Sequence, residues 1–342
     1  MYDPFKRGRF SVGVRTLDLH DRKRRLRTHA ELWYPAGESH FGQDYAAQTL
    51  DVYTLDETGE TRTQEAVRDA DAAPGNHALI VYSHGTTRWK RRSATFLCTH
   101  LASHGYVVAA LDHYETFMPS ATGDDVVANR PADVSFLVDW MLAGVTNTGD
   151  IGIEPSRIGA VGYSLGGWAA LSALESEGRI RALVAHAPAG ASKPRPGVFD
   201  GKLSFKWKRE VPAMYLFAEN DTLTTYEGAK ELFKRAPSPK KSFVLRSADH
   251  MHFVDGVEEE HEFMRTTEWP EEMSYIPAEM RPAADLCPGA KAQAFTAAIT
   301  LAHLDASLLW KDDARRWLGE NVREKLLPLG IDAYGSGQSA RT

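Results

Sequence analysis

Cysteine is scarce in this 342-residue sequence, which has only Cys98 and Cys287 and so lacks the disulfide framework of a small secreted domain. One bridge between them is chemically allowed, but Cys98 lies in an apolar helical stretch, which favours a buried free thiol. A basic excess is also lacking, because the net charge is −6. The sequence therefore has no general positive field for nucleic acid, and we interpret its one basic run, residues 22–27, as a hairpin turn.

Long apolar runs are missing as well. The first residues lack the apolar core of a secretion signal, so we expect a cytoplasmic protein, whereas a leader trimmed earlier would imply secretion. The longest apolar stretch near the C-terminus, 294–310, is interrupted by threonine, histidine, aspartate and serine, and predicts an amphipathic helix instead of a membrane span. Helices over about 289–310 and 312–325 could pack on the core or form a homodimer contact, so the oligomeric state stays open.

Short apolar runs alternate with helical patterns, which predicts an α/β fold with a mostly parallel central sheet flanked by helices. An opening hairpin is expected over 11–18 and 26–34. Helical segments are expected between the later strands, for example over 132–142 and 165–174. The runs that predict buried strands are 78–83, 106–112, 157–163, 182–187, 213–218 and 242–246.

Neither a repeat nor a low-complexity linker divides the sequence, so we predict a single domain over residues 1–342 with three insertions. Residues 36–76 are polar and predict a surface insertion. Residues 189–210 are basic and aromatic, whereas residues 255–285 are acidic. These two follow strands on the side where open sheets carry their sites, so both could frame a pocket as cap or loop insertions.

The segment Gly162-Tyr163-Ser164-Leu165-Gly166 follows an apolar strand and opens an Ala/Leu-rich helix. In such a tight turn the side chains beside the serine would collide, and glycine at 162 and 166 removes them. The serine hydroxyl then projects above the sheet at the positive end of the helix. We therefore predict Ser164 as a nucleophile, the alternative being a structural turn with an idle serine.

A serine needs a base to become a nucleophile, and the base needs a carboxylate to orient it. Around such an elbow the chain order is serine, acid and histidine. Asp221 follows a strand that ends at the same edge as Ser164 and is the predicted acid, with Glu219 as the alternative. His250 follows the next strand and is the predicted base, with His252 as the alternative.

The two histidines also allow a metal site. A His-x-His pair presents two ligands on one side of an extended segment, and Asp249 or His261 could complete the set. Because the serine and the aspartate already account for a histidine, we favour the triad, which requires no metal and no cofactor.

A histidine–glycine turn, Ser83-His84-Gly85-Thr86, follows the first buried strand. Such a turn can aim a backbone N–H at the negative charge that develops on a substrate oxygen. The predicted oxyanion-hole donors are the N–H groups of Thr86 and Leu165. We interpret His84 as a structural turn residue and not as a second base.

Several segments together resemble the platelet-activating factor acetylhydrolase family. In that family's pattern two residues and a phenylalanine follow the catalytic histidine, as Phe253 follows His250. The segments are 83–85, 101–113, the serine elbow and 249–255. The Leu-Ala-Ser-His-Gly block at 101–105 and the acid turn at 218–222 also resemble bacterial cutinase-like polyester hydrolases and dienelactone-hydrolase-like enzymes.

The resemblance covers roughly residues 77–255 and the strand at 31–35, and it implies an α/β-hydrolase fold. It implies a serine carboxylic-ester hydrolase that acts through an acyl-enzyme on small or medium esters. Alternatives are a polyester or phospholipid-type acyl ester hydrolase, a thioesterase or an amidase on the same triad, and a non-catalytic binding protein of the same fold. Thr86 and Thr87 depart from the glycine, apolar or aromatic residues of these families, which argues against a polymer-binding cleft. The expected partner is a small-molecule ester, with no nucleic acid and no membrane span.

Overall fold

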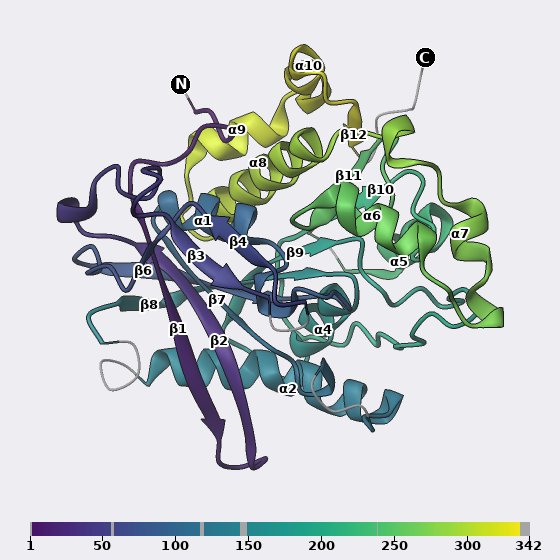
Figure 1. The fold of residues 1–342 in the computed structure, drawn as a ribbon, viewed down its shortest axis with the longest axis horizontal. Helices are drawn as coiled ribbons and strands as arrows, with labels where there is room; N and C mark the ends of the chain where they lie inside the picture. The colour runs from purple at the N-terminus through teal and green to yellow at the C-terminus, as the bar shows by residue number, and fades with distance from the viewer. Residues whose placement is uncertain (1, 56–57, 117–119, 144–148, 238, 336–342) are drawn as a thin grey trace.

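One twisted sheet runs through the computed structural model, which describes residues 2–55, 58–116, 120–143, 149–237 and 239–335 (Figure 1). Within these residues the sheet has ten strands in the order β12-β11-β10-β9-β8-β6-β7-β2-β1-β5. Their alternation with helices gives the mostly parallel α/β sheet that the sequence predicted. The mutually parallel strands are β6 (Asn76–Ser83), β7 (Tyr106–Leu111), β8 (Gly152–Tyr163), β9 (Ile180–His186), β10 (Ala213–Ala218) and β11 (Lys240–Leu245).

Antiparallel strands extend the sheet on both sides. β1 (Val12–Asp21) and β2 (Leu26–Pro35) form a long hairpin whose second strand pairs with β7. β12 (Ala333–Gly335) pairs antiparallel with β11, and the short β5 (Val67–Arg68) runs parallel to β1. The basic run 22–27 lies at the hairpin turn, as predicted, and this end of the hairpin projects from the body of the protein (Figure 1).

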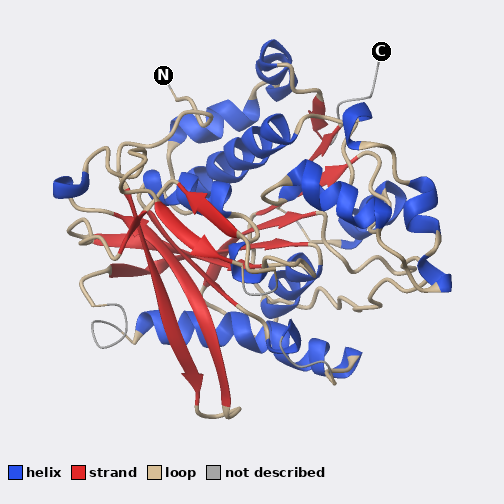
Figure 2. Cartoon of the chain, in the orientation of Figure 1, coloured by secondary structure: helices blue, strands red, loops and turns tan. Residues whose placement is uncertain are grey.

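Helices cover both faces of the sheet (Figure 2). α1 and α8 pack on one face, whereas α2, α4 and α5 pack on the other. Because side chains alternate along a strand, β6 sends Ile80 and Tyr82 into the first core and Leu79 and Val81 into the second. The helices are α1 (Thr95–Ser103), α2 (Gly123–Leu142), α4 (Leu165–Ala173), α5 (Tyr226–Arg235) and α8 (Gly289–Ser307).

The predicted buried strands are all present, and α4 corresponds to the predicted helix at 165–174. The prediction for α2 was wrong at its start, because the helix begins at Gly123 and not at residue 132. A capping box between Thr122 and Asp125 starts the helix, and Pro131 lies inside it. A proline normally breaks a helix interior, so a helix that continues through Pro131 goes against the local preference of the sequence.

α8 is buried on most of its surface, so the prediction of an amphipathic helix over 294–310 was wrong. Its polar side chains find partners inside the protein: Thr300 Oγ1 lies 2.9 Å from His186 Nε2, and the Tyr106 hydroxyl donates to Asp305 at 2.9 Å. Such partners allow polar residues to enter a core. Across the described residues, the helices all fall short of the length and hydropathy needed to span a membrane.

The predicted helix at 312–325 is two helices, α9 (Asp312–Gly319) and α10 (Val322–Leu326), with a break between them. Both pack against the first core through side chains such as Trp317 and Leu326. The C-terminal helices therefore cover the core in the described chain.

Most described residues of the segment 36–76 are exposed or half-buried, and the segment contacts the sheet through a few buried side chains; residues 56–57 lie outside the described residues. Gln64 accepts a hydrogen bond from Trp33 Nε1 at 2.7 Å in a buried position. Further elements of the three insertions are β3 (Asp51–Thr54), β4 (Thr61–Gln64), α6 (Val257–Thr266) and α7 (Tyr275–Glu279). Short 3-10 turns are η1 (Glu38–His40), η2 (Lys90–Arg92), η3 (Tyr114–Thr116), η4 (His250–Phe253), η5 (Glu271–Met273), η6 (Ala283–Asp285) and η7 (Leu327–Leu329).

Glu31 is a fully buried carboxylate that ties the outer hairpin to the segment after β6. From β2 its side chain pairs with Arg68 at 2.9 Å, Arg91 at 3.4 Å and Arg92 at 3.0 Å. Arg91 also pairs with Asp112, just after β7. Three guanidinium groups offset the cost of burying the Glu31 charge, so this cluster holds η2 against the sheet.

We predict that Glu31→Gln lowers the free energy of unfolding by about 3–5 kcal/mol, because it leaves buried arginine charge without its partner. Urea denaturation would measure the change. Glu60→Gln is the control, since Glu60 is exposed and pairs with Arg62 at 2.8 Å, and it should cost less than about 0.5 kcal/mol. Equal losses in the two variants would contradict the role of the Glu31 cluster.

Candidate active site

Ser164 lies at the turn between β8 and α4 with φ 53° and ψ −120°. Non-glycine residues rarely adopt positive φ, and such strain concentrates at functional sites. A Cβ on Gly162 would lie 2.3 Å from the carbonyl oxygen of Gly166, and a Cβ on Gly166 would lie 1.9 Å from that of Ser83. Only glycine fits at these two positions, which accounts for the pattern seen in the sequence.

His250, the first residue of η4, lies between Ser164 and Asp221. Its Nε2 is 2.9 Å from Ser164 Oγ, and its Nδ1 is 2.8 Å from Asp221 Oδ2. Because a carboxylate only accepts hydrogen bonds, Nδ1 carries the proton and Nε2 accepts from the serine hydroxyl. Asp221 and His250 are buried, whereas Ser164 is partly exposed. The structure thus joins the three predicted residues in one hydrogen-bonded chain.

The turn after β10 holds the Asp221 carboxylate in place. Oδ1 accepts the N–H groups of Leu223 at 2.9 Å and Thr224 at 2.7 Å, and Oδ2 accepts the Thr224 hydroxyl at 2.7 Å. Burial would raise the pKa of Asp221, but the charge of His250 and the hydrogen bonds from His250 and Thr224 hold that pKa below its usual value. The carboxylate therefore stays ionised at neutral pH.

Glu219 and His252, the alternative acid and the alternative base, contact groups outside the Ser164–His250–Asp221 chain. Glu219 lies beside Arg246, at 3.9 Å. His252 Nε2 lies 3.1 Å from the carbonyl oxygen of Cys287, and burial lowers the pKa of His252 to about 4. The imidazoles of His250 and His252 therefore meet different partners and do not converge on one metal position.

The candidate oxyanion turn, residues 83–86 and called the oxyanion turn below, packs against the serine elbow. A Cβ on Gly85 would lie 3.0 Å from Ser164 Cβ, so the turn that carries Thr86 contacts the serine. Leu165 is the first residue of α4, where backbone N–H groups lack helical partners. Within the described residues, neither the Thr86 nor the Leu165 N–H donates to another group. Both stay candidates for the oxyanion hole.

Asp249 is a residue that sequence reasoning considered only as a metal ligand. Its buried carboxylate joins the acid turn to the histidine loop, because Oδ1 accepts the N–H groups of Thr222 at 2.8 Å and His250 at 2.6 Å. Oδ2 accepts the Thr222 hydroxyl at 2.8 Å. Burial and the nearby charge of Asp221 raise the pKa of Asp249. The only sequence feature that pointed to a role for Asp249 at the site was its position directly before His250. The sequence cannot show that Thr222 donates hydrogen bonds to its carboxylate.

The acidic insertion at 255–285 meets arginines from other parts of the chain. One comes from the basic insertion at 189–210, one from the segment after the oxyanion turn, and one from β4. Opposite charges therefore offset each other around the site, so net segment charge does not predict a preference for charged substrates. The three ion pairs are Arg195 with Glu279, Arg88 with Glu260 and Arg62 with Glu259.

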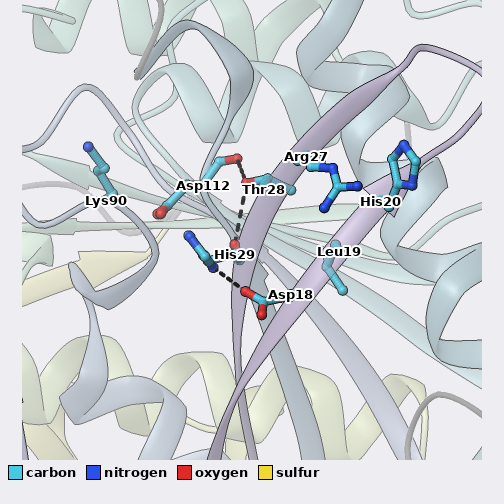
Figure 3. Close-up of a pocket in the computed structure, with 8 residues that line it drawn as sticks. All are labelled: Asp18, Leu19, His20, Arg27, Thr28, His29, Lys90 and Asp112. Atoms are coloured by element: carbon cyan, nitrogen blue, oxygen red, sulfur yellow. Dashed lines mark hydrogen bonds and ion pairs between the residues drawn. The ribbon is translucent and has the colours of Figure 1, made fainter.

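A surface cavity of about 500 Å³ lies beside the β1–β2 hairpin (Figure 3). Within it His29 Nδ1 pairs with Asp18 at 2.7 Å, and Thr28 Oγ1 donates to the carbonyl oxygen of Asp112 at 2.6 Å. β6 and β7 lie between β2 and the β8 strand that carries Ser164, so this cavity is separate from the candidate site. It is lined by Asp18, Leu19, His20, Arg27, Thr28, His29, Lys90 and Asp112.

A parallel sheet with a strand–serine–helix elbow, followed by an acid and a histidine after later strands, defines an α/β-hydrolase fold. A solved structure has the same fold. The ferulic acid esterase from Streptomyces cinnamoneus aligns with a TM-score of 0.62 over 89% of this chain and 92% of that chain, at 22% sequence identity.

The protein belongs to the PET hydrolase-like family, whose model matches residues 68–297, more than half of the chain. The sequence is 24% identical to cutinase est2 of Thermobifida alba over 62% of this chain and 64% of that protein. It is 23% identical to chloroplastic chlorophyllase-1 of Citrus sinensis over 62% of this chain and 66% of that protein. The chain thus spans less than two thirds of the length of these relatives. The resemblance to cutinase-like polyester hydrolases is confirmed.

We predict that Asp249→Ala lowers the free energy of unfolding by about 1–3 kcal/mol, because buried donors of Thr222 and His250 lose their acceptor. The same change should reduce turnover, since the acid turn and the histidine loop lose their link. Thermal and urea unfolding would measure stability. Asp285→Ala, at an exposed acid of the acidic insertion, is the control, and matching effects in both variants would contradict the role of Asp249.

Proposed function

We propose that the protein is a serine carboxylic-ester hydrolase that forms an acyl-enzyme on Ser164. The observation that carries this proposal is the hydrogen-bonded chain from Asp221 through His250 to Ser164. A structural turn would need neither the strained backbone of Ser164 nor an imidazole nitrogen held 2.9 Å from its hydroxyl. The partial exposure of the Ser164 residue supports a role in contacting a substrate.

In the proposed mechanism, His250 Nε2 takes the hydroxyl proton while Ser164 Oγ attacks the ester carbonyl. The N–H groups of Thr86 and Leu165 donate to the oxygen of the tetrahedral intermediate. His250 then gives the proton to the alcohol oxygen as the ester C–O bond breaks. Water, deprotonated by His250, attacks the acyl-enzyme and releases the acid. Asp221 maintains the imidazole tautomer and stabilises its positive form.

Small or medium carboxylic esters are the proposed substrates. The names of the relatives support ester hydrolysis, since they include cutinases and, by structure, a ferulic acid esterase. Membership of the PET hydrolase-like family favours a second candidate activity, the hydrolysis of polyesters. Thr86 and Thr87 stand where an aromatic residue is common in polyester hydrolases, and this departure favours soluble esters over a polymer.

We predict that Ser164→Ala lowers kcat/KM for p-nitrophenyl esters by roughly 10⁴-fold or more, because the nucleophile is removed. The measurement uses p-nitrophenyl esters with acyl chains from acetyl to dodecanoyl, with and without EDTA. The chain length that gives the highest kcat/KM indicates the size of the site that binds the acyl group. Ser172→Ala in the same helix α4 is the matched control and should retain wild-type turnover.

Activity that survives in Ser164→Ala, or that EDTA abolishes, would show that the serine mechanism is wrong. A fluorophosphonate probe that labels the wild type and not Ser164→Ala separates an enzyme from a binding protein. Thioester and amide substrates separate the remaining hydrolase classes, and product release from an amorphous polyester film tests the second candidate.

We predict that Asp221→Asn lowers kcat by about 10⁴-fold, because the amide favours the wrong imidazole tautomer. Glu219→Gln should retain near wild-type kcat, since Glu219 lies beside Arg246 and not beside His250. The same p-nitrophenyl assay compares the two variants. The reverse order of effects would make Glu219 the acid.

A further inference from the structure

A second Ser–His–Asp chain lies buried behind the oxyanion turn. Ser83 ends β6, His113 follows β7, and Asp133 comes from α2. Ser83 Oγ lies 2.7 Å from His113 Nε2, and His113 Nδ1 lies 2.8 Å from Asp133 Oδ2. The exposed fractions are 1% for Ser83, 2% for His113 and 4% for Asp133. A substrate cannot reach these groups, so the chain is not a second active site.

Hydrogen bonds join this chain to the oxyanion turn. The backbone N–H of His113 donates to His84 Nε2 at 3.3 Å, and His84 Nδ1 donates to the carbonyl oxygen of Gly85 at 2.6 Å. Arg130 donates to the carbonyl oxygen of His84. The carbonyl of Gly85 and the N–H of Thr86 belong to one planar peptide unit. A contact that fixes this carbonyl therefore also fixes the direction of the Thr86 N–H.

Burial and the surrounding charges keep His113 neutral, so that its Nε2 accepts the Ser83 hydroxyl. Burial, with the charge of Arg130, lowers the pKa of His113 well below its usual value. The second oxygen of Asp133 lies 2.7 Å from Arg24 Nη1, on the basic turn of the β1–β2 hairpin. Burial raises the pKa of Asp133 to about 6, although Arg24 acts in the opposite direction. The hairpin turn thus contributes a charge to the buried network.

We propose that Ser83, His113 and Asp133 form a positioning network that sets the orientation of the Thr86 N–H and thereby the rate of acyl transfer. This inference rests on the proposed function of the Ser164 site. Loss of one oxyanion-hole donor costs about 10²–10³ in rate, so a misdirected N–H loses part of that factor. Small displacements suffice, because a shift of about 1 Å in a catalytic group can cost about 10² in rate.

The test uses two variants of the network. Ser83→Ala removes one hydroxyl and little volume. His113→Asn keeps a donor for Asp133 but removes the acceptor for Ser83. His77→Gln is the matched control, because His77 lies on β6 at its other end, with Nδ1 3.0 Å from the carbonyl oxygen of Gly105.

The measurements are kcat and KM for p-nitrophenyl butyrate, the melting temperature, and the affinity of butylboronic acid, which forms a tetrahedral adduct with a nucleophilic serine. We predict that Ser83→Ala lowers kcat by about 10–100-fold while KM stays near wild type, because an oxyanion contact is made in the transition state. Boronate affinity should fall by a similar factor. His77→Gln should change only the melting temperature.

The Thr86 amide resonance in ¹⁵N-threonine-labelled protein gives a readout that does not depend on activity. It should shift in Ser83→Ala and stay in place in His77→Gln. The proposal is overturned if folded Ser83→Ala keeps wild-type kcat, if the loss appears in KM alone, or if kcat falls without a shift of the Thr86 resonance. If His113→Asn does not fold, the result for Ser83→Ala alone tests the proposal. Absence of esterase activity in the wild type would refute the proposed function, and the Thr86 resonance would still report on the network.

Discussion

The contact between the serine elbow and the end of β6 is the constraint on which the rest of the site depends. β6 and β8 are neighbours with Ser83 opposite Gly162, and Gly166 brings the first turn of α4 against the Ser83 carbonyl oxygen. A side chain at position 166 would force these two backbones apart. One close approach therefore sets the distance between the candidate nucleophile and the candidate oxyanion turn. The acid turn and the histidine loop then reach the same edge on β10 and β11, at the fixed spacing of a sheet.

The features that sequence predicted correctly depend on neighbouring residues or on chain order. The elbow at Ser164 is a local pattern of strand, glycine and helix, and the order of Asp221 and His250 follows from the strands before them. The features that it missed depend on contacts between distant segments. Thr222 forms a hydrogen bond with Asp249 only because β10 and β11 pair in the sheet. Thr300 would be assigned to the surface from the sequence alone, because the sequence does not show that His186 lies beside it. Neither contact has a periodic signal along the chain.

Charge was the least informative feature of the sequence for the same reason. The acidic stretch at 255–285 and the basic stretch at 189–210 carry opposite charge in the sequence, and both were expected to frame a pocket. In the fold, Arg195 pairs with Glu279, so charges that looked like separate fields form contacts instead. Even a fully buried carboxylate such as Glu31 is stable where several arginines converge on it. Composition counts charges, but only the fold shows which of them remain free to act on a ligand.

The two Ser–His–Asp chains show that this hydrogen-bond pattern does not by itself identify a nucleophile. Both have short contacts in the same order, and both have an aspartate on Nδ1 of the histidine. They differ in backbone and in exposure. Ser164 has a strained positive φ and is partly exposed, whereas Ser83 is buried at the end of a regular strand. Strain persists only where the surrounding structure enforces it, and here it turns one serine toward solvent. Ser83 makes the same hydrogen bonds as a triad serine, but it is buried away from any substrate. Its proposed role is therefore limited to positioning the turn at residues 83–86.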